Sequence, residues 1–184
     1  MFLDRFRKSL NKRILYLLAI LGFLIVLLVE IFVFIPIEAT VSKYGILDYE
    51  FAWTSSRVEI IFSVWGTSGI DRQLMAIYWD FLFIVGYVSL AFALVTLVLQ
   101  SSTGKLEAIG TYITITPFLT GIFDIIENTF LVLMANTPTA VSNILPLIAS
   151  LSATVKFGFL FVAIIYFGIV LLFILIDKFI KKKQ

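Results

Sequence analysis

Residues 148–176 read IASLSATVKFGFLFVAIIYFGIVLLFILI, an apolar run interrupted by a single charged side chain, Lys156. A helix needs about 20 consecutive apolar residues to cross the hydrocarbon core of a bilayer. Three similar runs precede this one, at about residues 14–36, 74–99 and 108–134. The sequence therefore predicts an all-α fold: a four-transmembrane-helix bundle that makes residues 1–184 a single integral membrane domain.

The composition agrees with a membrane protein. Hydrophobic residues make up 61% of the 184-residue chain and charged residues 14%, against about 45–50% and about 25% in soluble domains. The chain has no Cys and no His, which excludes thiolate and imidazole metal sites and a Ser-His-Asp triad. A net charge of +2 is too small to indicate a nucleic-acid partner. We expect the lipid bilayer as the main partner, with no cofactor and no metal.

The basic residues predict the orientation of the spans. Most of them flank the first span, lie between the second and third spans, or follow the last span: Arg5, Arg7, Lys8, Lys12, Arg13, Lys105, Lys178, Lys181, Lys182 and Lys183. The opposite side of a four-span protein would hold only Lys43, Arg57 and Arg72. The positive-inside rule then predicts a multi-pass protein of the plasma (cell) membrane with both termini in the cytoplasm.

The connection between the first two spans, residues 37–73, is long enough to hold extra structure. It contains SRVE at 56–59, a capping-box pattern. Apolar residues then follow at helical spacing, before Gly66: Val58, Ile61, Phe62 and Trp65. We predict a short extracytoplasmic amphipathic helix that begins at Ser56. It either lies among the lipid headgroups or covers the bundle mouth as a lid that includes Arg57 and Trp65. Residues 44–53 are compatible with strand or coil.

The spans contain five ionisable side chains: Glu30, Asp80, Asp124, Glu127 and Lys156. An Asp or Lys at the middle of a membrane helix costs about 2.5–3.5 kcal/mol, so such groups normally face the bundle interior and pair. At a rise of about 1.5 Å per residue, all five fall within the outer half of the bilayer. Residues from four separate helices at one depth favour a shared polar site over isolated anchoring charges.

The third span has the clearest polar stripe. Its members are Thr116, Thr120, Asp124 and Glu127, with Asn128 beside them. Pro117 is expected to kink this helix. Tyr87 lies two turns from Asp80 on the same face of the second span. We expect Lys156 to pair with Asp124 or Asp80 and the pair Asp124 and Glu127 to share a proton. Helix–helix hydrogen bonding alone is the structural alternative.

Several stretches resemble a group of small, four-span bacterial membrane proteins whose activity is uncharacterised. They are SRVE at 56–59, VWG at 64–66, WDFLF at 79–83 with Tyr87, FDIIEN at 123–128 and TVKF at 154–157. The resemblance runs from about residue 51 to the end of the chain. It implies the same four spans and supports the polar residues chosen above, but it implies no activity.

Three functions are compatible with these residues. The favoured one is a ligand- or ion-binding site of Asp80, Asp124, Glu127, Asn128, Lys156, Tyr87 and Glu30, which binds or transports a small cation, a proton or an amphipathic ligand, with a homo-oligomer possible. An enzyme that acts on a lipid by carboxylate acid–base chemistry is less favoured, since the chain has no nucleophile motif and no P-loop. Lys156 would also repel a metal ion held by the nearby carboxylates. The third is an interaction or immunity-type membrane subunit.

Overall fold

The computed structural model describes residues 10–40 and 43–181. Most of them are helical, and the described part of the chain has no strand. The elements are α2 (Lys12–Val29), the π-helix η1 (Glu30–Phe34), α3 (Ile35–Glu38), α4 (Ile46–Glu50), α5 (Ser55–Leu99), α6 (Lys105–Ile113), α7 (Thr116–Asn136) and α8 (Ile144–Lys181). The basic residues Arg5, Arg7, Lys8, Lys182 and Lys183, on which the orientation partly depends, lie outside the described residues.

Four helical stretches are long and apolar enough to cross a membrane: Lys12–Glu38, Ser55–Leu99, Lys105–Asn136 and Ile144–Lys178. Each contains one of the four predicted spans, so the predicted helical fold with four candidate spans is confirmed. The second stretch is much longer than expected because α5 continues through residues that we assigned to the connection. Many large apolar side chains on these stretches are exposed, as in Phe32, Tyr112 and Leu172, and this is what a surface that faces lipid requires.

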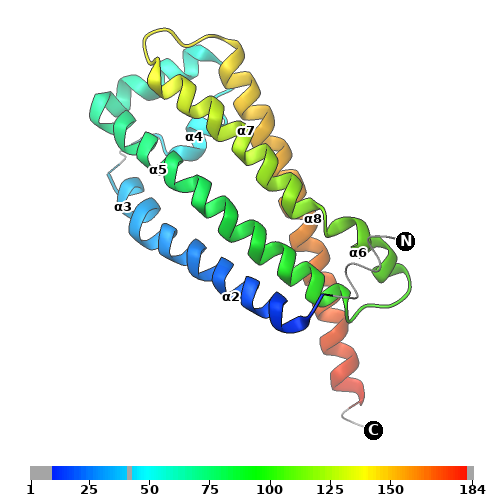
Figure 1. Cartoon of the computed structure of the whole chain (residues 1–184). Helices are drawn as coiled ribbons and strands as arrows, with labels where there is room; N and C mark the ends of the chain where they lie inside the picture. The colour runs from blue at the N-terminus through cyan, green and yellow to red at the C-terminus, as the bar shows by residue number, and fades with distance from the viewer. Residues whose placement is uncertain (1–9, 41–42, 182–184) are drawn as a thin grey trace.

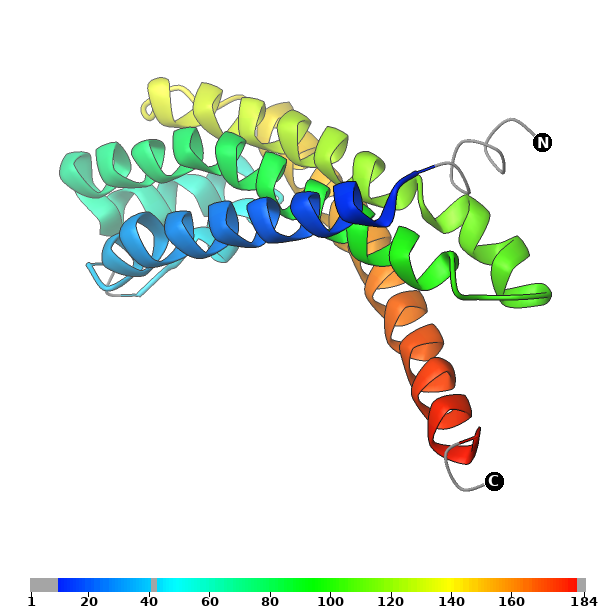
Figure 2. The same cartoon turned by 60° about the horizontal axis from the view of Figure 1, so that its bottom comes forward.

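The helices pack as two pairs, α2 against α5 and α7 against α8, with α5 also in contact with α7 and α8 (Figure 1). At the end of the bundle that holds α4, a core forms around Tyr49, Ile61, Ile77, Leu131 and Met134. At the other end, α6 packs on α8, where the Tyr166 hydroxyl donates to the Leu106 carbonyl at 3.1 Å. Figure 2 shows the C-terminal half of α8 diverging from the other helices.

Two glycines bring α2 and α5 into backbone contact. A Cβ atom on Gly22 would lie 2.5 Å from the carbonyl oxygen of Gly86 and 2.8 Å from the backbone nitrogen of Leu90. A Cβ on Gly86 would lie 3.1 Å from the carbonyl oxygen of Gly22. Small residues at such crossings let membrane helices approach closely, where packing supplies the association energy. This crossing therefore fixes how α2 lies against α5.

The beginning of α5 differs from the prediction. The N-cap is Thr54, whose Oγ1 accepts from the Arg57 backbone N–H at 3.3 Å. The predicted capping box at residues 56–59 is wrong, because Thr54 already has the extended backbone of a cap and Ser56 lies inside the helix. The apolar face predicted for this segment is buried: Val58, Ile61, Phe62 and Trp65. Gly66 interrupts the helix with φ 62° and ψ 179°, a conformation that glycine alone adopts at little cost.

Two prolines explain further irregularities. The predicted kink at Pro117 is a complete break: α6 ends at Ile113, and α7 starts at Thr116 with Pro117 in its first turn, where a missing N–H costs nothing. In the first span, the π-helix η1 ends just before Pro36. Because proline cannot donate to the preceding turn and crowds its carbonyl, the turn widens there. Residues 44–53, which we left between strand and coil, contain the short helix α4 instead.

Candidate functional site

Lys156 of α8 is the centre of a buried charge cluster. Its Nζ lies 2.8 Å from Glu127 Oε2, 2.9 Å from Asp124 Oδ1 and 3.5 Å from Glu50 Oε2. Lys156 is 7% exposed and Glu127 is fully buried. The predicted Lys156–Asp124 pair is therefore confirmed. The three carboxyls compensate the buried ammonium, which would be costly without a partner.

The other predicted polar residues surround this cluster. The Tyr87 hydroxyl of α5 donates to Asp124 Oδ2 at 2.8 Å, so the second and third spans meet where the period of each helix predicts. Asp80 does not pair with Lys156; it accepts from Asn128 Nδ2 at 2.6 Å. Asn128 follows Glu127 directly on α7, so its side chain points toward α5 while that of Glu127 points toward α8.

Glu50, the third acidic partner of Lys156, was missed by the sequence analysis. It is the last residue of α4, in a segment for which no periodicity predicted a buried face. Ser150 of α8 holds it in place: the Ser150 hydroxyl donates to the Glu50 carbonyl at 2.7 Å and accepts from the Trp53 backbone N–H at 3.0 Å. The Tyr49 hydroxyl also donates to the Leu131 carbonyl at 2.8 Å. These bonds fix α4 against both α7 and α8.

The surroundings of Glu50 favour its neutral form. Burial raises the pKa of the Glu50 carboxyl above its ordinary value, and the negative charge of Asp124 raises it further. The Lys156 ammonium and the neighbouring Glu127 carboxyl lower this pKa, but they offset only part of the effect of burial. Glu50 is therefore a group whose protonation state depends on what approaches it.

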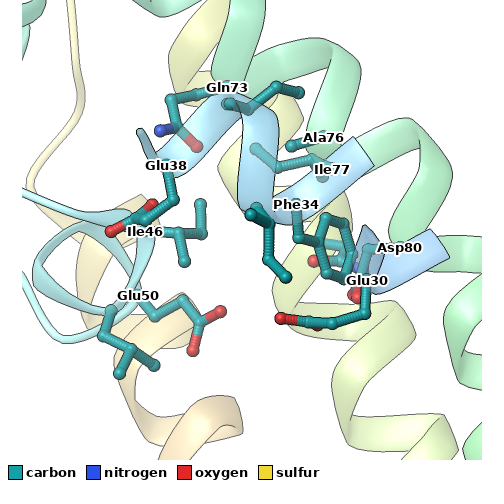
Figure 3. A pocket seen from close by; sticks show the side chains of 13 residues that line it. Glu30, Phe34, Glu38, Ile46, Glu50, Gln73, Ala76, Ile77 and Asp80 are labelled. Carbon is teal, nitrogen blue, oxygen red and sulfur yellow. The ribbon is translucent and has the colours of Figure 1, made fainter. Parts of the chain in front are cut away.

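A cavity of about 350 Å³ opens beside Glu50, between the first span, α4 and α5. Among the described residues, no basic side chain lines it, and four carboxyl side chains do: Glu30, Glu38, Glu50 and Asp80. Figure 3 shows the carboxyl groups of Glu30 and Glu50 directed into the same opening from opposite sides. The rest of the wall is mainly apolar and includes Phe34, Ile46 and Ile77. Glu50 belongs both to this cavity and to the Lys156 cluster.

Gln73 adds a polar group that the sequence analysis did not select. It is 2% exposed and lines the cavity, and Figure 3 shows its amide at the edge of the cavity, near Glu38. Its Nε2 has no hydrogen-bond partner among the described residues. A buried amide N–H₂ that lacks an acceptor is rare in folded proteins, because it has lost its hydration without compensation. This atom is therefore available to an oxygen atom of a ligand.

The two residues predicted to form a lid do not line the cavity. Trp65 is buried, and its Nε1 donates to the Tyr44 carbonyl at 2.7 Å. Arg57 pairs with Asp48 at 3.3 Å and lies over the Tyr44 ring, 4.5 Å from its centroid. Arg57 and Trp65 therefore attach α5 to α4 and to the segment before α4.

A metal centre is not indicated by the described carboxylates. Within residues 10–40 and 43–181, no group of three or more acidic side chains is arranged to hold a metal ion. Asp124 and Glu127 point to Lys156, whereas Asp80 points to Asn128. Glu50 therefore joins two groups of acidic side chains: the cluster that pairs with Lys156, and the cavity, whose other carboxyls, Glu30, Glu38 and Asp80, form no ion pair with a described cation.

We expect Ser150→Ala to loosen α4 without disturbing the four long helices. The substitution removes the hydroxyl that accepts from Trp53 and leaves the buried Glu50 carbonyl without its donor, a loss of about 1–3 kcal/mol. Trp53 also has a positive φ of 61°, a strained conformation that this hydroxyl helps to hold. Amide hydrogen exchange over residues 46–53 should accelerate. Ser63→Ala, which removes only an exposed bond within α5, should leave exchange there unchanged.

Comparisons with protein-family models, with curated protein sequences and with solved structures find no match to this chain. The resemblance to small four-span bacterial proteins therefore stays a prediction.

Proposed function

We propose that this protein binds a small cation in the cavity beside Glu50, within a membrane whose cytoplasmic side holds both chain termini. The observation that carries the proposal is the lining of the cavity: four carboxyl groups, no basic side chain, and the unpartnered amide of Gln73. Four acidic groups in a partly apolar site create a negative potential that attracts and holds a positive charge. A volume of about 350 Å³ falls in the range of ligand sites.

An ammonium group fits this lining better than a metal ion does. An ammonium needs only one or two carboxylates as hydrogen-bond acceptors. Hard metal ions need six or more oxygen ligands at short distances, and the described carboxylates are spread around the cavity instead. The apolar wall would contact the carbon atoms of the amine, and Gln73 Nε2 would donate a hydrogen bond to a hydroxyl or carbonyl oxygen of the ligand.

Catalysis on a lipid fits the geometry less well. Three carboxyls would perform the acid–base chemistry: Asp80, Asp124 and Glu127. Asp124 and Glu127 are paired with Lys156 and do not line the cavity, and Asp80 lines it but accepts a hydrogen bond from Asn128. General acid–base catalysis requires a carboxyl within hydrogen-bonding distance of the substrate. A ligand in the cavity would contact only the carboxyls that line it, and these carboxyls are suited to bind a positive charge.

Binding of butylammonium to the full chain in lipid nanodiscs, measured by titration calorimetry, tests this proposal. We expect Asp80→Asn and Glu50→Gln each to weaken binding by about 10- to 100-fold, since a hydrogen bond to a charged group contributes about 1.5–3 kcal/mol. Glu59→Gln is the matched control, because Glu59 is exposed on α5 and does not line the cavity. Wild-type protein without measurable affinity, or equal affinity in all three variants, would refute cation binding at this site.

We also expect the affinity to depend on pH through Glu50. A cation binds the ionised carboxylate, and the pKa of Glu50 is raised by burial, so binding must displace a proton wherever Glu50 is still protonated. The dissociation constant for butylammonium should increase as the pH falls through this raised pKa, by at most about tenfold per pH unit for one proton. The charged groups that face Glu50 are Lys156, Asp124 and Glu127 in the cluster and Glu30, Glu38 and Asp80 across the cavity.

Glu50→Gln should remove this part of the pH dependence, and Glu59→Gln should keep the wild-type profile. The number of protons released on binding, measured in two buffers of different ionisation enthalpy, provides an independent check. An unchanged profile in Glu50→Gln would assign the pH dependence to another group.

A further inference from the structure

A second hollow of about 580 Å³ lies on the outside of the same two helical segments that wall the cavity. We call it the lateral groove and define it by Val29, Phe32, Val33, Met75, Trp79 and Leu82. These side chains are apolar, and several of them are among the most exposed in the chain: Phe32 is 71% exposed and Met75 58%. In a membrane, such a surface faces the hydrocarbon chains of lipids.

The lateral groove and the acidic cavity are neighbours along both walls. Ile37 lines both of them. On α5, Trp79 belongs to the groove and the next residue, Asp80, to the cavity. On the first span, Val33 belongs to the groove and Phe34 to the cavity. Adjacent residues on a helix project in directions about 100° apart, so one pair of helical segments presents an acidic face on one side and an apolar face on the other.

We propose that the ligand is a single-chain amphiphile with an ammonium head, which binds its head in the acidic cavity and its alkyl chain in the lateral groove. This rests on the proposed cation site and adds the class of ligand. The ammonium head is inferred from charge complementarity, because carboxyls line the cavity and no basic side chain of the described residues does. The alkyl chain is inferred from adjacency: Ile37 lines both hollows, so an apolar groove lies directly beside the cavity that holds the head. Such a molecule would enter sideways from the lipid.

The π-helix η1 is the part of the first span where the two hollows meet. Its first residue, Glu30, lines the cavity, and Phe32 and Val33 line the groove. A π-turn holds more residues per turn than an α-turn, and π-helical turns occur frequently at functional sites. With the turn widened here, Glu30 lines the cavity while Phe32 and Val33 line the groove, although all three belong to one five-residue segment.

The experiment compares dodecylammonium and butylammonium with the full chain in lipid nanodiscs. Each amine is compared with itself across variants, so its partition into the lipid cancels. Met75→Trp and Leu82→Trp fill the groove at positions that are 58% and 41% exposed, where a larger side chain has room. We expect both variants to weaken dodecylammonium binding at least tenfold and to change butylammonium binding less than twofold. Ile122→Trp, at a 52% exposed position on α7 outside the groove, is the matched control and should affect neither amine.

The outcomes separate this inference from the proposed function. In one outcome, the wild type binds butylammonium through the cavity and the groove variants leave dodecylammonium binding intact. The lateral groove then does not hold the alkyl chain, and the amphiphile proposal fails while the cation site stands. Equal loss of both amines in the groove variants would also overturn the amphiphile proposal, because the two hollows would not be separate subsites. If the wild type binds neither amine, the proposed cation site itself fails.

Discussion

Replacing Lys156 by Met is expected to destabilise the bundle more than any other single substitution of a polar residue. The ammonium lies within 3.5 Å of Glu50, Asp124 and Glu127, and its removal leaves three buried carboxyls without a positive partner. Breaking a buried ion pair by removing one side costs about 3–5 kcal/mol. The Tm of the purified protein, followed by fluorescence-detected size-exclusion chromatography after heating, should fall far below that of the wild type.

A neutralised cluster provides the decisive comparison. Lys156→Met combined with Glu50→Gln, Asp124→Asn and Glu127→Gln removes all four charges together, and such replacements are often neutral for stability. We expect this combination to recover much of the Tm that Lys156→Met loses. Lys178→Met is the control for loss of a lysine from α8, because Lys178 is exposed. A wild-type Tm for Lys156→Met alone would contradict the assigned charge cluster.

The second large effect is expected for Gly22→Leu, which should separate α2 from α5. The first side-chain carbon would lie 2.5 Å from the Gly86 carbonyl oxygen, and a backbone atom of a neighbouring helix cannot move aside as a flexible side chain would. Overpacking of this kind costs about 1–3 kcal/mol or more. Because η1 and α3, which follow directly on α2, contribute one wall of the acidic cavity, butylammonium binding should weaken together with the Tm.

Gly158→Leu on α8 is the matched substitution, since a Cβ atom there meets nothing within 4 Å. It should leave the Tm and butylammonium affinity close to the wild-type values. A wild-type Tm and wild-type butylammonium affinity in Gly22→Leu would show that the glycine contact does not fix the helix pair.

The sequence was sufficient to predict the four long helical stretches and part of the candidate site. Long apolar runs define membrane helices regardless of tertiary contacts, so all four candidate spans were found. Helical period also placed Asp124 and Tyr87 correctly, and they meet across α5 and α7. Lys156 was recognised as a buried cation because a charge within an apolar run must find a partner.

The missed residues share one property: their role depends on contacts between distant parts of the chain. Glu50 lies in a short helix whose position is set by Ser150, 100 residues away. Gln73 lies in a helix that continues beyond the predicted span, so it was assigned to the connection. The start of α5 was misplaced because the S-x-x-E pattern at residues 56–59 indicated Ser56 as the cap, whereas the extended backbone of Thr54 and its bond from the Arg57 N–H make Thr54 the cap.

The division of the charge cluster between α7 and α8 has a consequence for how the chain enters the membrane during synthesis. α7, which carries Asp124 and Glu127, leaves the ribosome before α8, which carries Lys156. Each unpaired charge near the middle of a membrane helix costs about 2.5–3.5 kcal/mol on insertion, so α7 alone is a poor substrate for the translocon. Residues 137–143 join the two helices closely. The energetics therefore favour insertion of α7 and α8 together as a helical hairpin, with the ion pairs formed before the hairpin leaves the insertion machinery.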